Sequence, residues 1–159
     1  YKLKYLDSIR VMEILPDKVS EEVKLAALLH DIPEDTRYKI DDLREMGYSE
    51  LTLGIVEKLT HLKQEKPYHL FINNIVEDVC RASRKDTKTL EDAINEGAIL
   101  VKYADICHNT TDERMQGLKP AKQDKLWKKY TAAKIMLRMA VKTLGYEDFD
   151  PQRTAAKLR

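Results

Sequence analysis

The chain has 159 residues, of which 43% are hydrophobic and 35% are charged. That length and that apolar fraction suit one globular domain with a hydrophobic core and leave no room for a second domain. The formal net charge is +1, and acidic and basic residues are mixed along the sequence. No basic surface field therefore favours duplex nucleic acid as a partner.

No apolar run approaches the roughly 20 residues needed to cross a bilayer, and no signal-peptide core precedes the first charged residues. We therefore expect a soluble protein without a membrane partner. The two cysteines, Cys80 and Cys107, lie in apolar helical stretches and lack the spacing of metal-binding cysteine pairs. Reduced thiols and a cytoplasmic protein are expected. The sequence leaves the oligomeric state open.

Apolar residues recur at intervals of three and four through most of the chain, and no extended alternating pattern indicates a strand. This predicts an all-α fold, a single-domain helical bundle of about seven segments. Ser20 and Ser49 are suited to cap helices, and Pro16, Gly47 and Gly145 to end them. The expected helices cover residues 3–15, 20–30, 41–46, 49–60, 67–79, 90–109 and 120–145, followed by a loose tail over residues 146–159.

One apolar helix ends in a group of ionisable side chains. The stretch LAALLHDIPEDT contains His30, Asp31, Glu34 and Asp35. Burying a carboxylate or an imidazole is costly unless a metal, an opposite charge or hydrogen bonds replace the lost water. Pro33 disfavours helical geometry in the residue before it, so we expect Glu34 and Asp35 on a loop. This stretch predicts a functional site.

A second polar row lies farther along the chain, within LVKYADICHNT. Lys102, Asp105 and Asn109 are three and four residues apart, which places them on one face of a helix. The neighbouring positions are apolar, so the polar row is embedded in a largely buried helix, where a ligand is held rigidly. These neighbours are Ile94, Ala98, Val101 and Ala104.

Taken singly, these residues have simpler interpretations. His30 suits a hydrogen-bonded core histidine, and Glu34 and Asp35 suit a polar turn after a proline. Asn109 is a residue type found at helix ends, and Lys102 can extend its ammonium to solvent. Their clustering favours a metal site instead. Three other histidines have no partner at ligand spacing and are expected at the surface or at helix ends: His61, His69 and His108.

The His30–Asp31 pair with the late Asp105 resembles the HD-domain superfamily of metal-dependent phosphohydrolases. The longer motifs, HDxxEDT at residues 30–36 and VKxADxxxN at 101–109, resemble the hydrolase domain of RelA/SpoT-type alarmone enzymes. The resemblance extends over residues 1–145, which we expect to form the hydrolase domain, with residues 146–159 as a C-terminal tail.

The resemblance implies a manganese-dependent hydrolase that removes pyrophosphate from the 3′ position of guanosine tetraphosphate or pentaphosphate. It implies that His30, Asp31 and Asp105 hold the metal, and that Glu34 and Asp35 prepare the attacking water. The residue types agree with this chemistry, because carboxylates with an imidazole suit Mn²⁺ or Mg²⁺ better than a soft metal.

The same resemblance implies that Asn109 and Lys102 face the nucleotide substrate, and that Lys102 offsets phosphate charge. Arg114 is a further candidate on proximity in sequence alone. The family residues that precede the first helix and grip the purine are not present in this sequence. The candidates to replace them are Lys2, Lys4 and Arg10.

The departure from the family pattern is at the first metal ligand. The family has a histidine in a stretch such as YIxHPIxVA, whereas residues 5–12 here read YLDSIRVM. Alignment of Ile9 and Val11 with the family's apolar pair places Asp7 where the histidine would be. An aspartate can ligate a hard cation, with a shorter reach. The alternative is a site with three protein ligands only.

Two other functions are consistent with these motifs. The first is an HD-type nucleotidase acting on another small nucleotide, although such relatives generally lack the Glu-Asp-Thr continuation. The second is a regulatory domain that binds a metal or a nucleotide and has lost turnover with the first histidine. The retained carboxylate pair, Glu34 and Asp35, argues against that loss, because unused acidic residues beside a core are costly.

Overall fold

The computed structural model describes residues 2–61, 67–79 and 87–158, with side chains from Tyr5 onward within these ranges. They contain helices and no strand, which confirms the all-α fold. No helix within these ranges has the length and apolar character of a membrane span. The helices are α1 (Lys2–Ile14), α2 (Glu21–Leu29), α3 (Ile32–Asp35), α4 (Ile40–Glu45), α5 (Glu50–Leu59), α6 (Tyr68–Val76), α8 (Leu90–Asn109), α9 (Asp112–Gln116), α10 (Pro120–Thr143) and α11 (Pro151–Lys157).

The helix ends follow the local signals in the sequence. The hydroxyl oxygens of Ser20 and Ser49 accept hydrogen bonds from the backbone amides three residues on, at the starts of α2 and α5. Gly47 and Gly145 have φ values of +94° and +91°, which glycine adopts without strain, and they follow α4 and α10. These predicted boundaries are confirmed to within a residue or two.

Residues 32–35 differ from the expected loop, because they form the single turn of α3. Pro33 occupies the first turn of this helix, where no amide hydrogen is needed and the fixed φ of proline suits the helix. The carbonyl oxygen of Asp31 accepts hydrogen bonds from the amides of Glu34, at 3.2 Å, and Asp35, at 2.9 Å. The proline therefore starts a helix here, and the two acidic residues lie one turn beyond Asp31.

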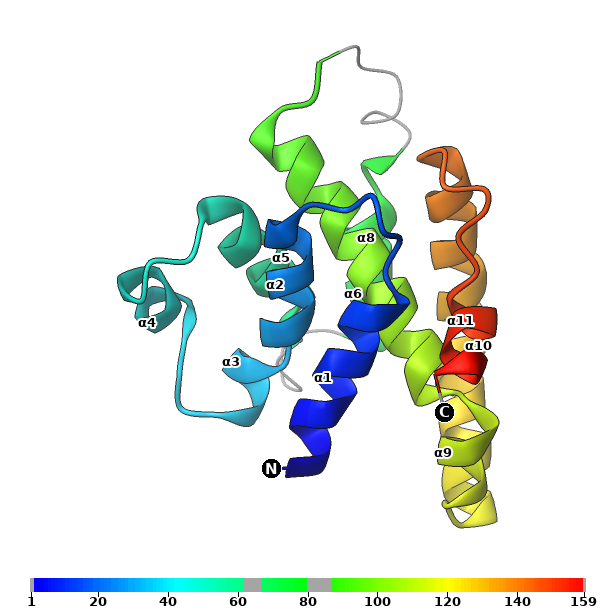
Figure 1. The fold of residues 1–159 in the computed structure, drawn as a ribbon. Coiled ribbons are helices and arrows are strands. Elements are labelled where there is room, and N and C mark those ends of the chain that lie inside the picture. Colours follow the sequence, from blue (N-terminus) through cyan, green and yellow to red (C-terminus); the bar gives the residue numbers. More distant parts are fainter. Residues whose placement is uncertain (1, 62–66, 80–86, 159) are drawn as a thin grey trace.

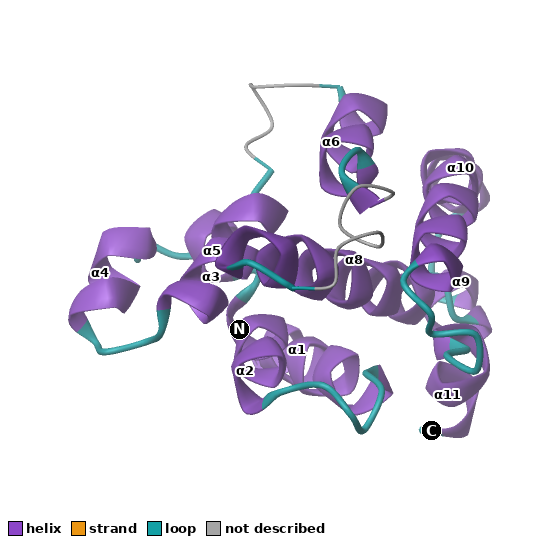
Figure 2. Ribbon diagram, turned by 90° about the horizontal axis from the view of Figure 1, so that it is seen from above, coloured by secondary structure: helices purple, strands orange, loops and turns teal. Residues whose placement is uncertain are grey.

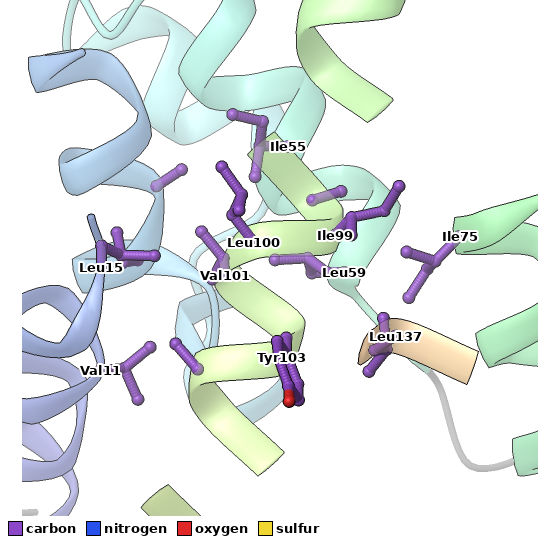
Figure 3. Packing of buried hydrophobic residues seen from close by; sticks show 14 of the residues in the cluster. Val11, Leu15, Ile55, Leu59, Ile75, Ile99, Leu100, Val101, Tyr103 and Leu137 are labelled. Carbon is purple, nitrogen blue, oxygen red and sulfur yellow. The ribbon is translucent and has the colours of Figure 1, made fainter. Parts of the chain in front are cut away.

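Helix α8 runs through the middle of the bundle. Figure 2 shows α1 and α2 on one side of it, α6 on the other, and α10 across its end. Its sequence from Gly97 to Val101 is buried without interruption, as expected of a helix surrounded by others. In Figure 3, Ile99 extends toward Ile75 of α6, and Val101 lies on the side of Leu15. A residue on α8 is therefore held by packing on several sides.

The C-terminal residues do not form the expected loose tail. Asp150 caps α11 by accepting a hydrogen bond from the amide of Arg153 at 3.1 Å. Pro151 and Ala155 are buried, and α11 packs against α8 and α1 (Figure 1). A short helix with two small buried residues carries little hydrophobic periodicity, so its sequence did not indicate the packing.

The contact between α5 and α8 depends on two glycines that lie opposite isoleucines. A Cβ atom built on Gly97 of α8 would overlap Ile55 of α5, and one on Gly54 of α5 would overlap Ile94 of α8. Ile55 is fully buried and has no room to move away. The absence of side chains at these positions lets the two helices approach closely.

Replacing Gly97 by alanine is therefore expected to destabilise the fold by about 1–3 kcal/mol, although alanine favours helices. Urea denaturation followed by circular dichroism measures the change in the free energy of unfolding. A second substitution, Ile55→Val, removes the methyl group that would clash and is expected to recover part of the loss. A G97A variant as stable as the wild type would show that the close approach has no energetic importance.

Candidate metal centre

His30 lies at the end of α2 with one ring nitrogen fixed and the other facing two carboxylates. Its Nδ1 lies 2.6 Å from the carbonyl oxygen of Ala27, which holds the ring and makes Nδ1 the protonated nitrogen. Its Nε2 lies 3.2 Å from Oδ1 of Asp31 and 3.6 Å from Oδ1 of Asp105. The side chain is almost fully buried, and Nε2 has no hydrogen-bond partner in the described part of the chain.

The electrostatics of these three residues favour a cation between them. Burial of His30, the largest single influence, lowers its pKa, but the carboxylates of Asp105 and Asp31 outweigh burial and raise the pKa to about 9. Burial raises the pKa of Asp31 above its ordinary value. The two carboxylates attract positive charge to the position of Nε2, and a divalent metal supplies more of it than a proton does.

Both carboxylate oxygens of Asp105 have partners on α8. Its Oδ2 lies 3.0 Å from Nζ of Lys102, and its Oδ1 accepts a hydrogen bond from Nδ2 of Asn109 at 3.1 Å. Burial alone would raise the pKa of Asp105, but the charges of Lys102 and His30 hold it far below its ordinary value. The row predicted on one face of α8 is thus a connected unit, with the carboxylate at its centre.

The acidic residues of α3 lie at the rim of this group. Glu34 and Asp35 are both exposed. The Oε1 atom of Glu34 accepts a hydrogen bond from the backbone amide of His61 at 2.5 Å. Partial burial of the Glu34 carboxyl raises its pKa, and the hydrogen bond from His61 and the charges of Lys102 and His30 oppose that rise, so this carboxyl is within electrostatic reach of the site. Asp35 contributes to the negative charge around Asp31.

Comparison with known families agrees with this geometry. The family model described as HD domain matches residues 6–110, about two thirds of the chain. The chain belongs to the HD-domain family. HD domains typically bind divalent metals and act as metal-dependent phosphohydrolases. No curated protein and no solved structure matches the chain.

The three predicted ligands of this HD domain fit a divalent metal by donor type. Within the described ranges, no group of three or more histidine, cysteine or acidic side chains is placed so that it could hold a metal ion as it stands. However, the buried Nε2 of His30 has no hydrogen-bond partner and faces two carboxylate oxygens, and an imidazole with carboxylates suits Mn²⁺ or Mg²⁺. We therefore retain His30, Asp31 and Asp105 as the residues that would hold the metal.

Asp7, proposed above as a fourth ligand, has other partners. Its Oδ1 lies 2.5 Å from Nη1 of Arg114 and 3.1 Å from Nε2 of His108. No hydrogen bond or ion pair joins it to the three candidate ligands within the described part of the molecule. The expectation that Asp7 replaces the first histidine is therefore not supported by this structure, because His108 at the end of α8 and Arg114 of α9 contact the carboxylate. These contacts favour the alternative of a site with three protein ligands, and a ligand role for Asp7 stays a prediction.

The other candidates for substrate contact are placed as follows. Arg10 forms an ion pair with Glu13 on the exposed side of α1 at 3.0 Å, and it lines a cleft with Asp7 and Arg114. This cleft contains none of the metal-site residues. The side chain of Lys4 lies outside the described residues. Substrate contacts by Arg10 and Lys4 therefore stay predictions.

An aromatic wall beside Lys102 and Asp105 was missed by sequence reasoning. Tyr68 and Phe71 of α6 and Tyr130 of α10 pack together, with ring centroids 5.8–6.0 Å apart in the Tyr68 pairs. His61, for which the sequence predicts a surface or helix-end position, stacks on Phe71 with ring centroids 4.6 Å apart. Nζ of Lys102 lies 5.6 Å from the centroid of the Phe71 ring. The HD site therefore has α3 on one side and the aromatic residues of α6 and α10 on the other.

Two polar groups of this wall face the site. The hydroxyl of Tyr68 is buried and has no hydrogen-bond partner among the described residues, and burial, with Asp105 and Glu34 nearby, raises its pKa. Nζ of Lys129 lies 4.4 Å from the centroid of the Tyr68 ring. Burial and the charge of Lys102 lower the pKa of Lys129. No local motif connects residues from α6 and α10 with the HD motifs, so only the packing of the bundle reveals them.

Proposed function

We propose that this HD domain is a Mn²⁺-dependent phosphohydrolase that removes pyrophosphate from the 3′ position of guanosine tetraphosphate or pentaphosphate, with Mg²⁺ as a possible replacement cation. The observation that supports it most is the buried Nε2 of His30, which lacks a hydrogen-bond partner and faces Asp31 and Asp105. The choice of substrate class rests on the HDxxEDT and VKxADxxxN motifs.

The three ligands divide into fixed and adjustable groups. Ala27 fixes the ring of His30, and Lys102 and Asn109 fix Asp105, whereas the side chain of Asp31 is 43% exposed. When bound, the divalent cation supplies charge that neutralises a phosphate and favours deprotonation of water. Two rigid ligands on buried helix positions are the kind of support that holds a cation in one place.

Glu34 and Asp35 are the proposed acid–base residues. The pKa of Glu34 is raised above its ordinary value, which makes the carboxylate a better proton acceptor. Its hydrogen bond from the amide of His61 holds one oxygen, so the other is free to orient water. Asp35 follows it on the same exposed turn, where solvent and substrate reach both groups.

Cations and hydroxyls line the side opposite α3 and are suited to the phosphates of the substrate. Lys102 and Lys129 supply positive charge, and the hydroxyl of Tyr68 supplies a donor that has no partner within the described fold. Asn109 holds Asp105 through one amide hydrogen and has a second for a nucleotide. We propose that these four residues orient the substrate.

The test is release of pyrophosphate from guanosine tetraphosphate by the purified protein, with added Mn²⁺ and with EDTA. We expect turnover that depends on Mn²⁺ and falls by at least about a hundredfold in Asp31→Asn, because a ligand is lost while this half-exposed position tolerates the change. Asp17→Asn, an exposed aspartate remote from the motifs, is the matched control and should retain full turnover. Turnover that EDTA does not affect would contradict the proposal.

The ion pairs of Asp7 with Arg114 and His108 favour one alternative function, a binding domain without turnover, which can be tested. A site with three protein ligands is consistent with a domain that binds a metal or nucleotide without turnover. Calorimetric titration with Mn²⁺ separates the cases, because tight binding without hydrolysis indicates the regulatory domain. Release of phosphate from a deoxynucleoside monophosphate instead of pyrophosphate from the alarmone would indicate an HD-type nucleotidase.

A further inference from the structure

A second cavity lies on the other side of α8 from the metal centre. It has a volume of about 440 Å³ and is bounded by α8, α10 and residues 146–152, the connection that runs back beside α10 to α11 in Figure 1. Tyr103 and Cys107 line it from α8. Successive helical residues turn by about 100°, so these two positions face away from the row that contains Asp105. The cavity is therefore separate from the HD site.

A row of three cations forms one wall of this cavity. Lys134, Arg138 and Lys142 are spaced four residues apart on α10, so they share one face of the helix and repel one another. Nζ of Lys134 donates a hydrogen bond to the neutral side chain of Gln152 at 2.7 Å. Arg138 and Lys142 form no hydrogen bond or ion pair with any residue that the structure describes. Two of the three cations therefore have no hydrogen-bonded or ion-paired partner among the described residues.

Tyr103 adds a hydroxyl and an aromatic ring to the lining of this cavity. The residue is 7% exposed, and its hydroxyl makes no hydrogen bond within the described ranges. Its ring packs edge-to-face against Phe149 at a centroid distance of 5.9 Å, which fixes its orientation beside the cavity. The hydroxyl is therefore available to donate a hydrogen bond to a ligand in the cavity.

Two carboxylates also line the cavity, but they do not cancel the charge of its three cations. Asp150 is committed to the amide of Arg153 at the start of α11. Glu147 is exposed. Three cations against two carboxylates give a net positive lining, and the committed Asp150 offers little to a cationic ligand. The aromatic rings of Tyr103 and Phe149 add an apolar surface suited to a ring.

We infer that this cavity binds an organic phosphate, a small molecule that joins a phosphate group to a flat ring. The phosphate lies against Arg138 and Lys142, since a guanidinium with an ammonium matches the charge and the acceptor geometry of a phosphate dianion. The ring packs against Phe149 and Tyr103, and the Tyr103 hydroxyl donates to a ligand oxygen. This site is independent of the reaction proposed for the HD motifs.

The test uses phenyl phosphate as the probe and the ¹⁵N-labelled full chain in EDTA, so that no divalent metal draws phosphate to the HD site. We expect saturable chemical-shift changes in the amides of residues 134–152. An Arg138→Gln/Lys142→Gln double variant is expected to bind at least about tenfold more weakly, because both charge-assisted contacts are lost. Tyr103→Phe, which keeps the ring and removes the hydroxyl, is expected to weaken binding to a smaller extent.

Lys128→Gln is the matched control, because it removes an exposed cation from α10 outside the cavity and should leave the affinity unchanged. Inorganic phosphate should bind more weakly than phenyl phosphate, since it lacks the ring. The inference is overturned if phenyl phosphate causes no saturable shifts, or if shifts persist with equal affinity in the double variant. Shifts restricted to residues 30–35 and 102–109 would also overturn it, because they would place the phosphate at the HD site.

Discussion

Replacing Asp105 by asparagine is expected to lower the free energy of unfolding by about 3–5 kcal/mol, because removal of one partner leaves a buried charge unpaired. Lys102 is the charge in question: its side chain is 13% exposed, and Asp105 is its ion-pair partner at 3.0 Å. Burial alone would lower the pKa of Lys102, but Asp105 raises it, so the ammonium stays charged in the folded protein. Asparagine keeps the shape of the side chain and removes only its charge.

Urea denaturation in EDTA measures this loss without a contribution from a bound metal. The matched control is Asp124→Asn, which breaks the exposed ion pair with Lys128 on α10 and is expected to cost less than about 1 kcal/mol. Adding Lys102→Met to the Asp105→Asn variant removes the unpaired charge and should recover a large part of the stability. If Asp105→Asn cost no more than Asp124→Asn, the buried pair would not hold the site together.

Substitution of Glu34 by glutamine is expected to reduce the hydrolysis rate by about 10²–10⁴, the contribution of a general base. The same reduction is expected for Asp35→Asn. Neither residue is a proposed metal ligand, and both are exposed, so the free energy of unfolding should change by less than about 0.5 kcal/mol. Glutamine keeps an oxygen that accepts the hydrogen bond from the His61 amide. Pyrophosphate release, calorimetric Mn²⁺ titration and thermal unfolding together check these expectations.

Glu45→Gln is the control for this pair, since Glu45 is an exposed acidic residue at the end of α4. It should leave the rate, the metal affinity and the stability unchanged. A Glu34→Gln variant that retains full turnover would remove Glu34 from the mechanism. A variant that loses Mn²⁺ affinity together with turnover would assign Glu34 to the metal instead of to the proton transfer.

The sequence predicted the local features of this molecule. Ser20 and Ser49 cap helices, and Gly47 and Gly145 lie just beyond helix ends, as their chemistry indicates. The shared face of Lys102, Asp105 and Asn109 is confirmed by two contacts to the Asp105 carboxylate. These features depend on residues within four positions of one another, and a helix fixes such relations by its own geometry.

Two other predictions were wrong, one because contacts with distant helices decide it and one because a proline also suits the start of a helix. The residues 146–159 read as a tail, but α11 is stable against α8 and α1 through burial of small side chains. Residues 32–35 read as a loop, although a proline in a first turn also starts a helix. An alignment placed Asp7 at the metal, and in the structure its carboxylate contacts Arg114 and His108, which are about a hundred residues away in sequence, so its role as a ligand stays a prediction.

The sequence by itself determined the all-α class, the helix ends and the HD motifs, because periodicity, capping and residue spacing are local properties. The tertiary structure decided which motif residues meet, by bringing the end of α2 against α8 so that His30 faces Asp105. It also placed the α6–α10 aromatic wall beside them and opened the second cavity behind α8. These relations arise from packing between helices that are far apart in the chain, and packing depends on the shapes of all the buried side chains at once.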